Sequence, residues 1–254
     1  MKFESRNPFL KNKSFTRTSN VEEREVSVID YADTMTVAGT MNKTFVLLML
    51  LVAGAIVTWS MTFQGYNPFI LTIGGAIVAL ILVIIAAFRP QNSAWLAPGY
   101  SIFEGLFIGG ISAIFETMYP GIVINAVGAT FMTFLVCLAL YKYRIVKVNE
   151  QFRSVVVAAT LAIATYYVIS WLFSMFTDFV PVHYGNSLIS IGISVFVIII
   201  AALNIFLDFD MIEKGTQQRF PKYMEWYGAM GLMVTLVWLY VEFLRLLSKI
   251  SSRD

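Results

Sequence analysis

Seven long apolar runs, separated by short polar breaks, make up most of the chain after residue 43. About 20 apolar residues in a helix cross the roughly 30 Å hydrocarbon core of a bilayer. The pattern therefore predicts transmembrane helices over residues 44–63, 69–88, 97–119, 121–142, 154–177, 187–208 and about 227–248. The break at 119–121 predicts a tight hairpin. Gly105 and Gly109, four residues apart in the third run, predict a close contact between two helices.

The composition agrees with this pattern. Apolar residues make up 58 % of the chain and charged residues 13 %, whereas a soluble domain carries about 25 % charge. Residues 1–43 are polar and mixed in charge, which predicts a largely disordered tail. We therefore expect an all-α integral membrane protein, with a tail over residues 1–43 and a seven-helix transmembrane domain over residues 44–250.

Lys and Arg side chains gather in the tail and in alternate loops. In the alternate loops they are Arg89, Lys142, Arg144, Lys147, Arg153, Lys214, Arg219 and Lys222, whereas the loops 64–68, 119–121 and 178–186 hold none. Basic loops stay in the cytoplasm, so we predict a multi-pass protein of the cell inner (plasma) membrane with a cytoplasmic N-terminus. Seven spans then place the C-terminus outside, although it carries Lys249 and Arg253. Either these charges are tolerated or the last segment does not fully cross; we favour seven spans.

Several kinds of chemistry are disfavoured by residue counts. The chain has one cysteine, Cys137, and one histidine, His183, which leaves almost no room for a zinc site of the usual type. A metalloprotease motif with two histidines is absent. We expect no enzymatic activity, no cofactor and no nucleic-acid partner.

Among the acids inside or near the ends of the predicted spans, four stand out: Glu104, Asp208, Asp210 and Glu242. An ionisable side chain in a membrane span is energetically unfavourable, so each is a candidate functional residue. Arg245 lies three residues after Glu242 and is expected to pair with it on the helix surface.

Small and polar side chains form stripes on the last two predicted helices. In the sixth run they are Ser187, Ser190, Ser194, Ala201, Asn204 and Asp208, and in the seventh Gly228, Gly231, Thr235, Trp238, Glu242, Arg245 and Lys249. One interpretation is helix packing, with polar groups bonded across the contact. The other is a permeation path or proton site, because hard cations bind oxygen ligands and neighbouring carboxylates share protons.

Two segments carry a resemblance to a known family. Residues 207–215, LDFDMIEKG, resemble the Asp-Phe-x-x-Ile-x-x-Gly stretch that ends the sixth helix of Bax inhibitor-1-like proteins. Residues 238–247, WLYVEFLRLL, resemble the final Leu-Tyr-x-Asp run of that family. The chain is similar to a bacterial member over roughly residues 44–250.

The resemblance implies a fold in which six helices surround a central seventh, and a pH-sensitive calcium leak. Asp208 and Glu242 would share a proton, gate the path and contact calcium transiently, with Asn204 as an additional candidate. The chain has Glu at 242 where the family commonly has Asp, and 34 residues separate the two acids. A helix that starts at Tyr223 would keep them apart, so they meet only if residues 221–231 stay largely outside the bilayer.

Two other functions remain open. One is a proton-coupled transporter that uses the same acids. The other is a non-conducting regulator that binds other membrane proteins, such as the membrane protease thought to bind bacterial relatives. The long polar tail and the packing motifs would serve that role.

Overall fold

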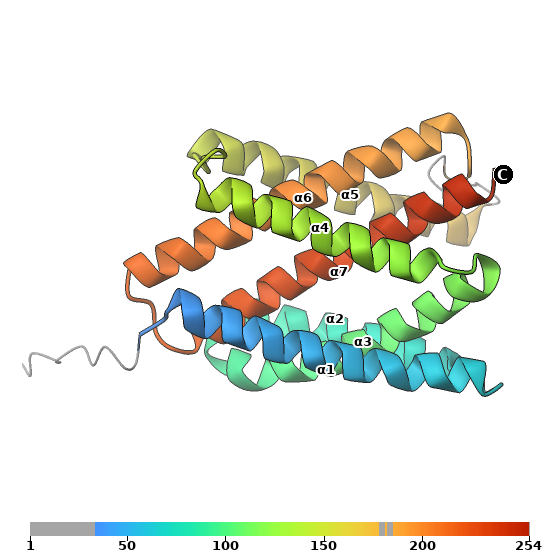
Figure 1. Cartoon of the computed structure of the whole chain (residues 1–254), viewed down its shortest axis with the longest axis horizontal. Helices are drawn as coiled ribbons and strands as arrows, with labels where there is room; N and C mark the ends of the chain where they lie inside the picture. The colour runs from blue at the N-terminus through green and yellow to red at the C-terminus, as the bar shows by residue number, and fades with distance from the viewer. Residues whose placement is uncertain (1–33, 178–180, 182–184, 254) are drawn as a thin grey trace, which may run out of the picture. The chain divides into compact units, whose positions relative to one another are not determined.

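The structure, a computed structural model, describes residues 34–177, 181 and 185–253. Seven helices in this part of the chain are each long and apolar enough to cross a membrane, which confirms the predicted all-α membrane fold (Figure 1). They are α1 (Val37–Phe63), α2 (Phe69–Phe88), α3 (Ser93–Met118), α4 (Ile122–Lys142), α5 (Glu150–Phe176), α6 (Leu188–Gln217) and α7 (Met224–Ser251). A short 3-10 helix, η4 (Pro90–Asn92), precedes α3. The first 33 residues, where most of the predicted tail falls, and His183 lie outside the described residues.

Several helices extend beyond the apolar runs that predicted them. Helix α1 begins at Val37 rather than at residue 44, because Thr36 caps it by accepting a hydrogen bond from the Gly39 amide at 2.9 Å. Helix α6 continues nine residues past residue 208, to Gln217. Hydropathy marks the length that lies in lipid, whereas polar caps set where a helix begins and ends.

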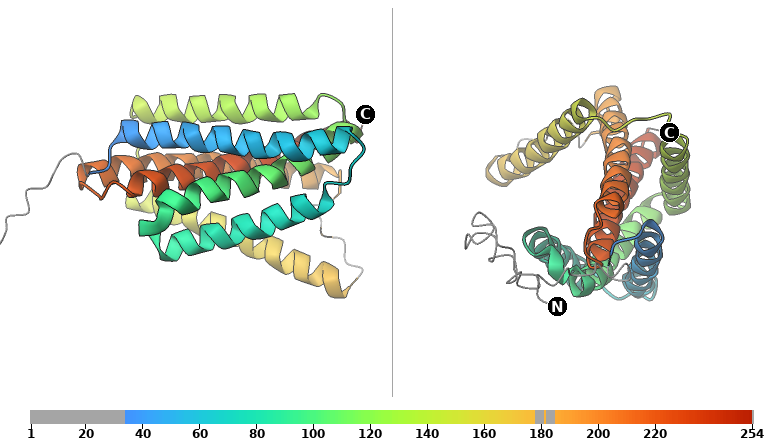
Figure 2. Two further views of the ribbon diagram at one scale, coloured as in Figure 1. Left: turned by 90° about the horizontal axis from the view of Figure 1, so that it is seen from below. Right: turned by 90° about the vertical axis from the view of Figure 1, so that its left-hand side faces the viewer.

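Helix α7 packs against α1, α3, α4 and α6, and α1 and α2 both pack on α3. Helix α5 packs chiefly on α6 and leans away from the other helices (Figure 2). The expected ring of six helices around the seventh therefore stays a prediction. The start of α1 and the α2–α3, α4–α5 and α6–α7 connections lie at one end of the bundle, on the left in Figure 1. We call it the basic end, because these connections carry the Lys and Arg side chains.

Glycines allow α1 and α3 to approach closely. A Cβ atom on Gly105 would lie 2.2 Å from the Leu51 carbonyl oxygen, and one on Gly109 would lie 2.1 Å from the Ala55 carbonyl oxygen. Both oxygens belong to the backbone and cannot rotate away. The close helix contact predicted from these two glycines is confirmed, and its partner is α1.

The Gly109→Ala substitution should lower the free energy of unfolding by about 1–3 kcal/mol, because the added methyl group forces α1 and α3 apart. Gly128→Ala is the matched control, since a Cβ atom there meets nothing within 4 Å. Denaturant titration of the purified protein in detergent measures both. Equal stability of the two variants would contradict the close contact.

The start of α1 is fastened to the α6–α7 connection at the basic end. The Met35 amide donates a hydrogen bond to the Phe220 carbonyl at 2.7 Å, and Thr34 forms an isolated antiparallel bridge with Pro221. The Met35 side chain also packs on Gly215, whose Cβ position lies 2.8 Å from the methionine sulfur. Chain segments nearly 190 residues apart are thus joined.

Glu225, in the first turn of α7, is the polar centre of this junction. Its carboxylate is 1 % exposed. It accepts hydrogen bonds from the Thr36 amide at 2.9 Å and from the Thr36 hydroxyl at 2.8 Å. It also pairs with Lys43, and with Lys222 at 3.3 Å. Four donors surround a single buried carboxylate, so its charge is well compensated.

Replacing Glu225 with Ala should lower the free energy of unfolding by about 3–5 kcal/mol, because Lys43 and the start of α1 lose a buried partner. Glu213→Ala is the comparison, since Glu213 is 32 % exposed and such pairs contribute about 0–1 kcal/mol. Thermal unfolding in detergent reports both changes. If Glu225→Ala lowered the stability no more than Glu213→Ala, the junction would not be a stabilising contact.

Candidate functional site

The two predicted stripes face each other along α6 and α7. Near one end, the Lys249 ammonium donates to the Ser194 hydroxyl at 2.7 Å and to the Ser190 carbonyl at 3.3 Å. Towards the basic end, the Asp208 carboxyl lies opposite Gly231, 3.8 Å from the position of a Cβ atom there. A polar seam therefore runs between these two antiparallel helices.

Asp208 occupies the part of this seam nearer the basic end. Its Oδ2 atom is buried and has no hydrogen-bond partner among the described residues. Thr235, one turn after Gly231 on α7, lies beside the carboxyl group. The absence of a side chain at Gly231 leaves room for the carboxyl group between the helices.

Glu242 lies further along α7 and is 1 % exposed. Its Oε1 atom accepts a hydrogen bond from the Tyr167 hydroxyl of α5 at 3.2 Å and from the Arg245 guanidinium at 3.3 Å. This confirms the pairing expected between Glu242 and Arg245. The guanidinium also lies over the Tyr167 ring, 5.4 Å from its centroid. The Oε2 atom, in contrast, is buried and has no partner in the described part of the chain.

The structure does not bring Asp208 and Glu242 together. Asp208 lies at the level of Gly231 and Thr235, and Glu242 is seven residues beyond Thr235, or about 10.5 Å of helix rise. The condition for a direct pair was that residues 221–231 form a loop or surface helix outside the bilayer. Instead Met224–Ser251 form one continuous helix, which keeps Glu242 further along its axis than Gly231. The two carboxyl groups therefore lie in series along the seam.

The other predicted site residues lie in different surroundings. Asn204 donates to the Thr160 hydroxyl of α5 at 2.8 Å and to the Ile200 carbonyl at 2.9 Å. Asp210 is buried and pairs with Arg153 and Lys214, away from the α6–α7 seam. Glu104 is half-buried on α3, and forms no hydrogen bond or ion pair with another described residue.

Comparison with known proteins decides the family. The sequence model of the Bax inhibitor 1 like family matches residues 7–252, nearly the whole chain. The chain belongs to the Bax inhibitor 1 like family. A comparison with curated proteins found no match.

Within this Bax inhibitor 1 like chain, the two residues that sequence reasoning overlooked around the seam are Tyr167 and Thr160, both on α5. Tyr167 bonds to Glu242 and Thr160 to Asn204. A pair of tyrosines, Tyr166 and Tyr167, in the middle of an apolar run could have indicated such a contact. A tyrosine hydroxyl buried there needs a hydrogen-bond partner.

In the seam of this Bax inhibitor 1 like protein, most polar groups have hydrogen-bond partners among the described residues and a few do not. Buried side-chain atoms without a partner in the described residues are Ser101 Oγ, Ser190 Oγ, Asp208 Oδ2 and Glu242 Oε2. Three of the four belong to the facing stripes of α6 and α7. A buried carboxyl oxygen without a donor readily binds a proton, a water molecule or a cation.

Proposed function

We propose that this protein is a pH-sensitive cation leak, with calcium the favoured ion, and that Asp208 and Glu242 act in series along the seam between α6 and α7. The observation that carries the proposal is the pair of inward-facing carboxyl oxygens, Asp208 Oδ2 and Glu242 Oε2, without hydrogen-bond partners in the described chain. They lie about two helical turns apart along the polar seam, Asp208 on α6 and Glu242 on α7. The proposal assigns no catalytic activity.

Two separated carboxylates suit passage better than tight binding. A hard cation is attracted by carboxylate and hydroxyl oxygens, and Thr235 lies beside Asp208 as Tyr167 does beside Glu242. Conduction requires binding that is favourable enough to admit the ion but weak enough to release it to the next site. A single carboxylate at each level meets that requirement.

Protons compete with the cation for the same oxygens. A protonated carboxyl group carries no charge and attracts a cation only weakly, so each acid is a switch that lowers conduction when it takes up a proton. Because the two carboxyl groups lie apart, they do not share one proton, in contrast to the pair that the family resemblance implied. Cation influx therefore falls as the pH is lowered.

Tethered cations already occupy part of the seam. Arg245 holds one oxygen of Glu242, and the buried Lys249 ammonium holds Ser194 beyond it. An entering calcium ion therefore displaces a side-chain cation rather than entering an open pore. This competition keeps the leak slow.

Calcium influx into proteoliposomes that contain a calcium dye should fall as the pH is lowered from about 8 to about 6. Asp208→Asn or Glu242→Gln should lower influx at the higher pH about tenfold, equivalent to about 1.4 kcal/mol, and should flatten the pH response. The control is Glu150→Gln, which neutralises an exposed acid outside the seam. Unchanged pH responses in both seam variants would remove this mechanism.

The double variant Asp208→Asn with Glu242→Gln distinguishes carboxyl groups in series from a shared-proton pair. Independent sites predict that the two reductions in influx multiply, because residues more than about 7–10 Å apart usually contribute additively in free energy. A shared-proton pair predicts that the double variant resembles either single variant. The same influx assay, analysed as a double-mutant cycle, decides between them.

Two other functions give different results in the same vesicles. A proton-coupled transporter would require proton flux for calcium uptake, so dissipating the proton gradient with an ionophore would abolish uptake; a leak continues. A non-conducting regulator that binds a membrane protein would show no influx in purified form, and deletion of residues 1–33 would abolish its effect. We propose the leak in the cell inner membrane, with the basic end in the cytoplasm.

A further inference from the structure

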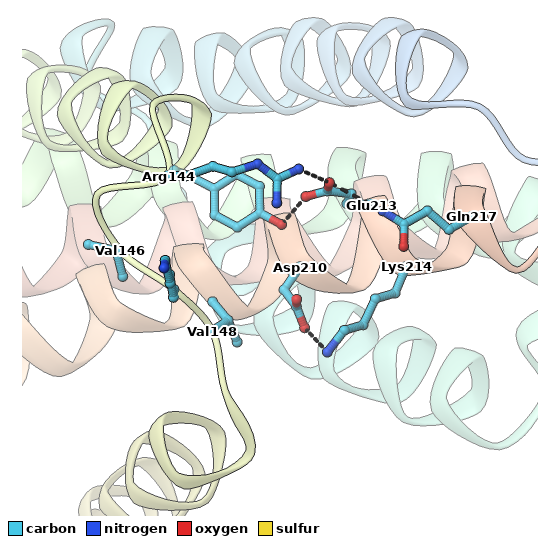
Figure 3. Close-up of a pocket in the computed structure, with 9 residues that line it drawn as sticks. Arg144, Val146, Val148, Asp210, Glu213, Lys214 and Gln217 are labelled. Atoms are coloured by element: carbon cyan, nitrogen blue, oxygen red, sulfur yellow. Dashed lines mark hydrogen bonds and ion pairs between the residues drawn. The ribbon is translucent and has the colours of Figure 1, made fainter.

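A second polar region lies at the basic end, apart from the seam. It is a cavity of about 320 Å³ between the α4–α5 connection and the last turns of α6 (Figure 3). Its lining consists of Tyr141, Arg144, Val146, Lys147, Val148, Asp210, Glu213, Lys214 and Gln217. The volume is at the lower end of the range of about 300–1,000 Å³ for small-molecule sites.

One of the two acids that line the cavity is already held by two cations. Asp210 accepts from the Arg153 guanidinium at 2.6 Å and from the Lys214 ammonium at 2.9 Å. The carboxylate is buried, whereas both cations are partly exposed. Each cation therefore retains donors that can bind a second anion.

The second acid, Glu213, is held by one cation and one hydroxyl group. The Glu213 carboxylate accepts hydrogen bonds from the Tyr141 hydroxyl at 2.5 Å and from the Arg144 guanidinium at 3.1 Å. Arg144 extends towards it from the α4–α5 connection (Figure 3). Lys147 also lines the cavity and forms no hydrogen bond or ion pair with any other described residue. Three cationic side chains and two carboxylates thus line the cavity, which leaves one positive charge in excess in its lining.

The position of the cavity indicates where its ligand comes from. Tyr143 and Ile145, on the same connection, are 73 % and 68 % exposed. Such side chains at the end of a membrane helix lie at the level of the lipid head groups. Val146 and Val148 add an apolar wall to the cavity, which suits a ligand with a charged group and an attached hydrocarbon.

We propose that this cavity binds an anionic phosphate group, of the kind carried by an anionic phospholipid head group. Arg and Lys are the side chains that bind phosphate oxygens best, and basic pockets between membrane helices bind anionic lipid head groups. Arg144 and Lys147 supply the accessible charges, and Asp210 and Glu213 position Lys214 and Arg144. The inference does not depend on the proposed ion leak.

The test uses the full chain in detergent, with dioctanoyl phosphatidylglycerol, dioctanoyl phosphatidylcholine and inorganic phosphate as probes. A ligand that binds only the folded protein raises the melting temperature in a saturable way. Phosphatidylglycerol should do so, and Lys147→Gln should weaken its binding about fivefold, as expected for the loss of one basic contact. Lys142→Gln is the matched control, since Lys142 is exposed on the last turn of α4 and does not line the cavity.

Inorganic phosphate distinguishes the two sources of the anion. Competition by phosphate, or binding of phosphate in place of the lipid, supports the site and identifies the phosphate group as sufficient. Lipid binding that phosphate does not displace supports it and identifies the lipid as the ligand. If Lys147→Gln and Lys142→Gln weakened phosphatidylglycerol binding equally, the proposal would be overturned. The lipid would then be attracted by the basic surface as a whole and not by the cavity. Equal binding of phosphatidylcholine, or no saturable binding of any probe, would overturn it as well.

Discussion

A charged side chain at the centre of a membrane-spanning helix destabilises the protein by about 2.5–3.5 kcal/mol unless the protein surrounds it. The packing of this molecule follows from that constraint. Lys249 bonds to α6, Glu242 to α5 and to Arg245, and Asp210 to Arg153 and Lys214. These contacts join the last three helices to one another. Helices α1 and α3 meet through glycines, and the Thr58 hydroxyl of α1 donates a hydrogen bond to the Leu106 carbonyl of α3 at 2.9 Å across this contact.

The same constraint separates structural acids from functional candidates. Glu225 has four donors around its carboxylate and Asp210 has two cations, so both are explained by the stability of the basic end. Asp208 and Glu242 each retain one buried oxygen without a donor in the described chain. A buried polar group without a partner in the protein calls for an explanation, and a bound water molecule or ion is one.

Local patterns in the sequence predicted what depends on nearby residues. Apolar runs identified all seven helices, helical periodicity identified the facing stripes of α6 and α7, and spacing identified the Glu242–Arg245 pair. Contacts between distant segments were missed. A first helical turn containing Glu225 reads as polar surface, since nothing near it in the sequence shows that Lys43 neutralises it. For the same reason the start of α7, and with it the distance between Asp208 and Glu242, could not be predicted.

The cap of α1 has a consequence for the order of events during synthesis. The Thr36 amide donates a hydrogen bond to the Glu225 carboxylate, and the two residues are 189 positions apart in the sequence. At about 5–20 residues per second, the ribosome needs roughly 10–40 s to make the intervening chain. During that interval α1 lacks the Glu225 carboxylate, so the Thr36 amide bonds to water or lipid instead. The hydrogen bond forms only after α7 has been made. The earliest segment to be inserted is thus among the last to be finished.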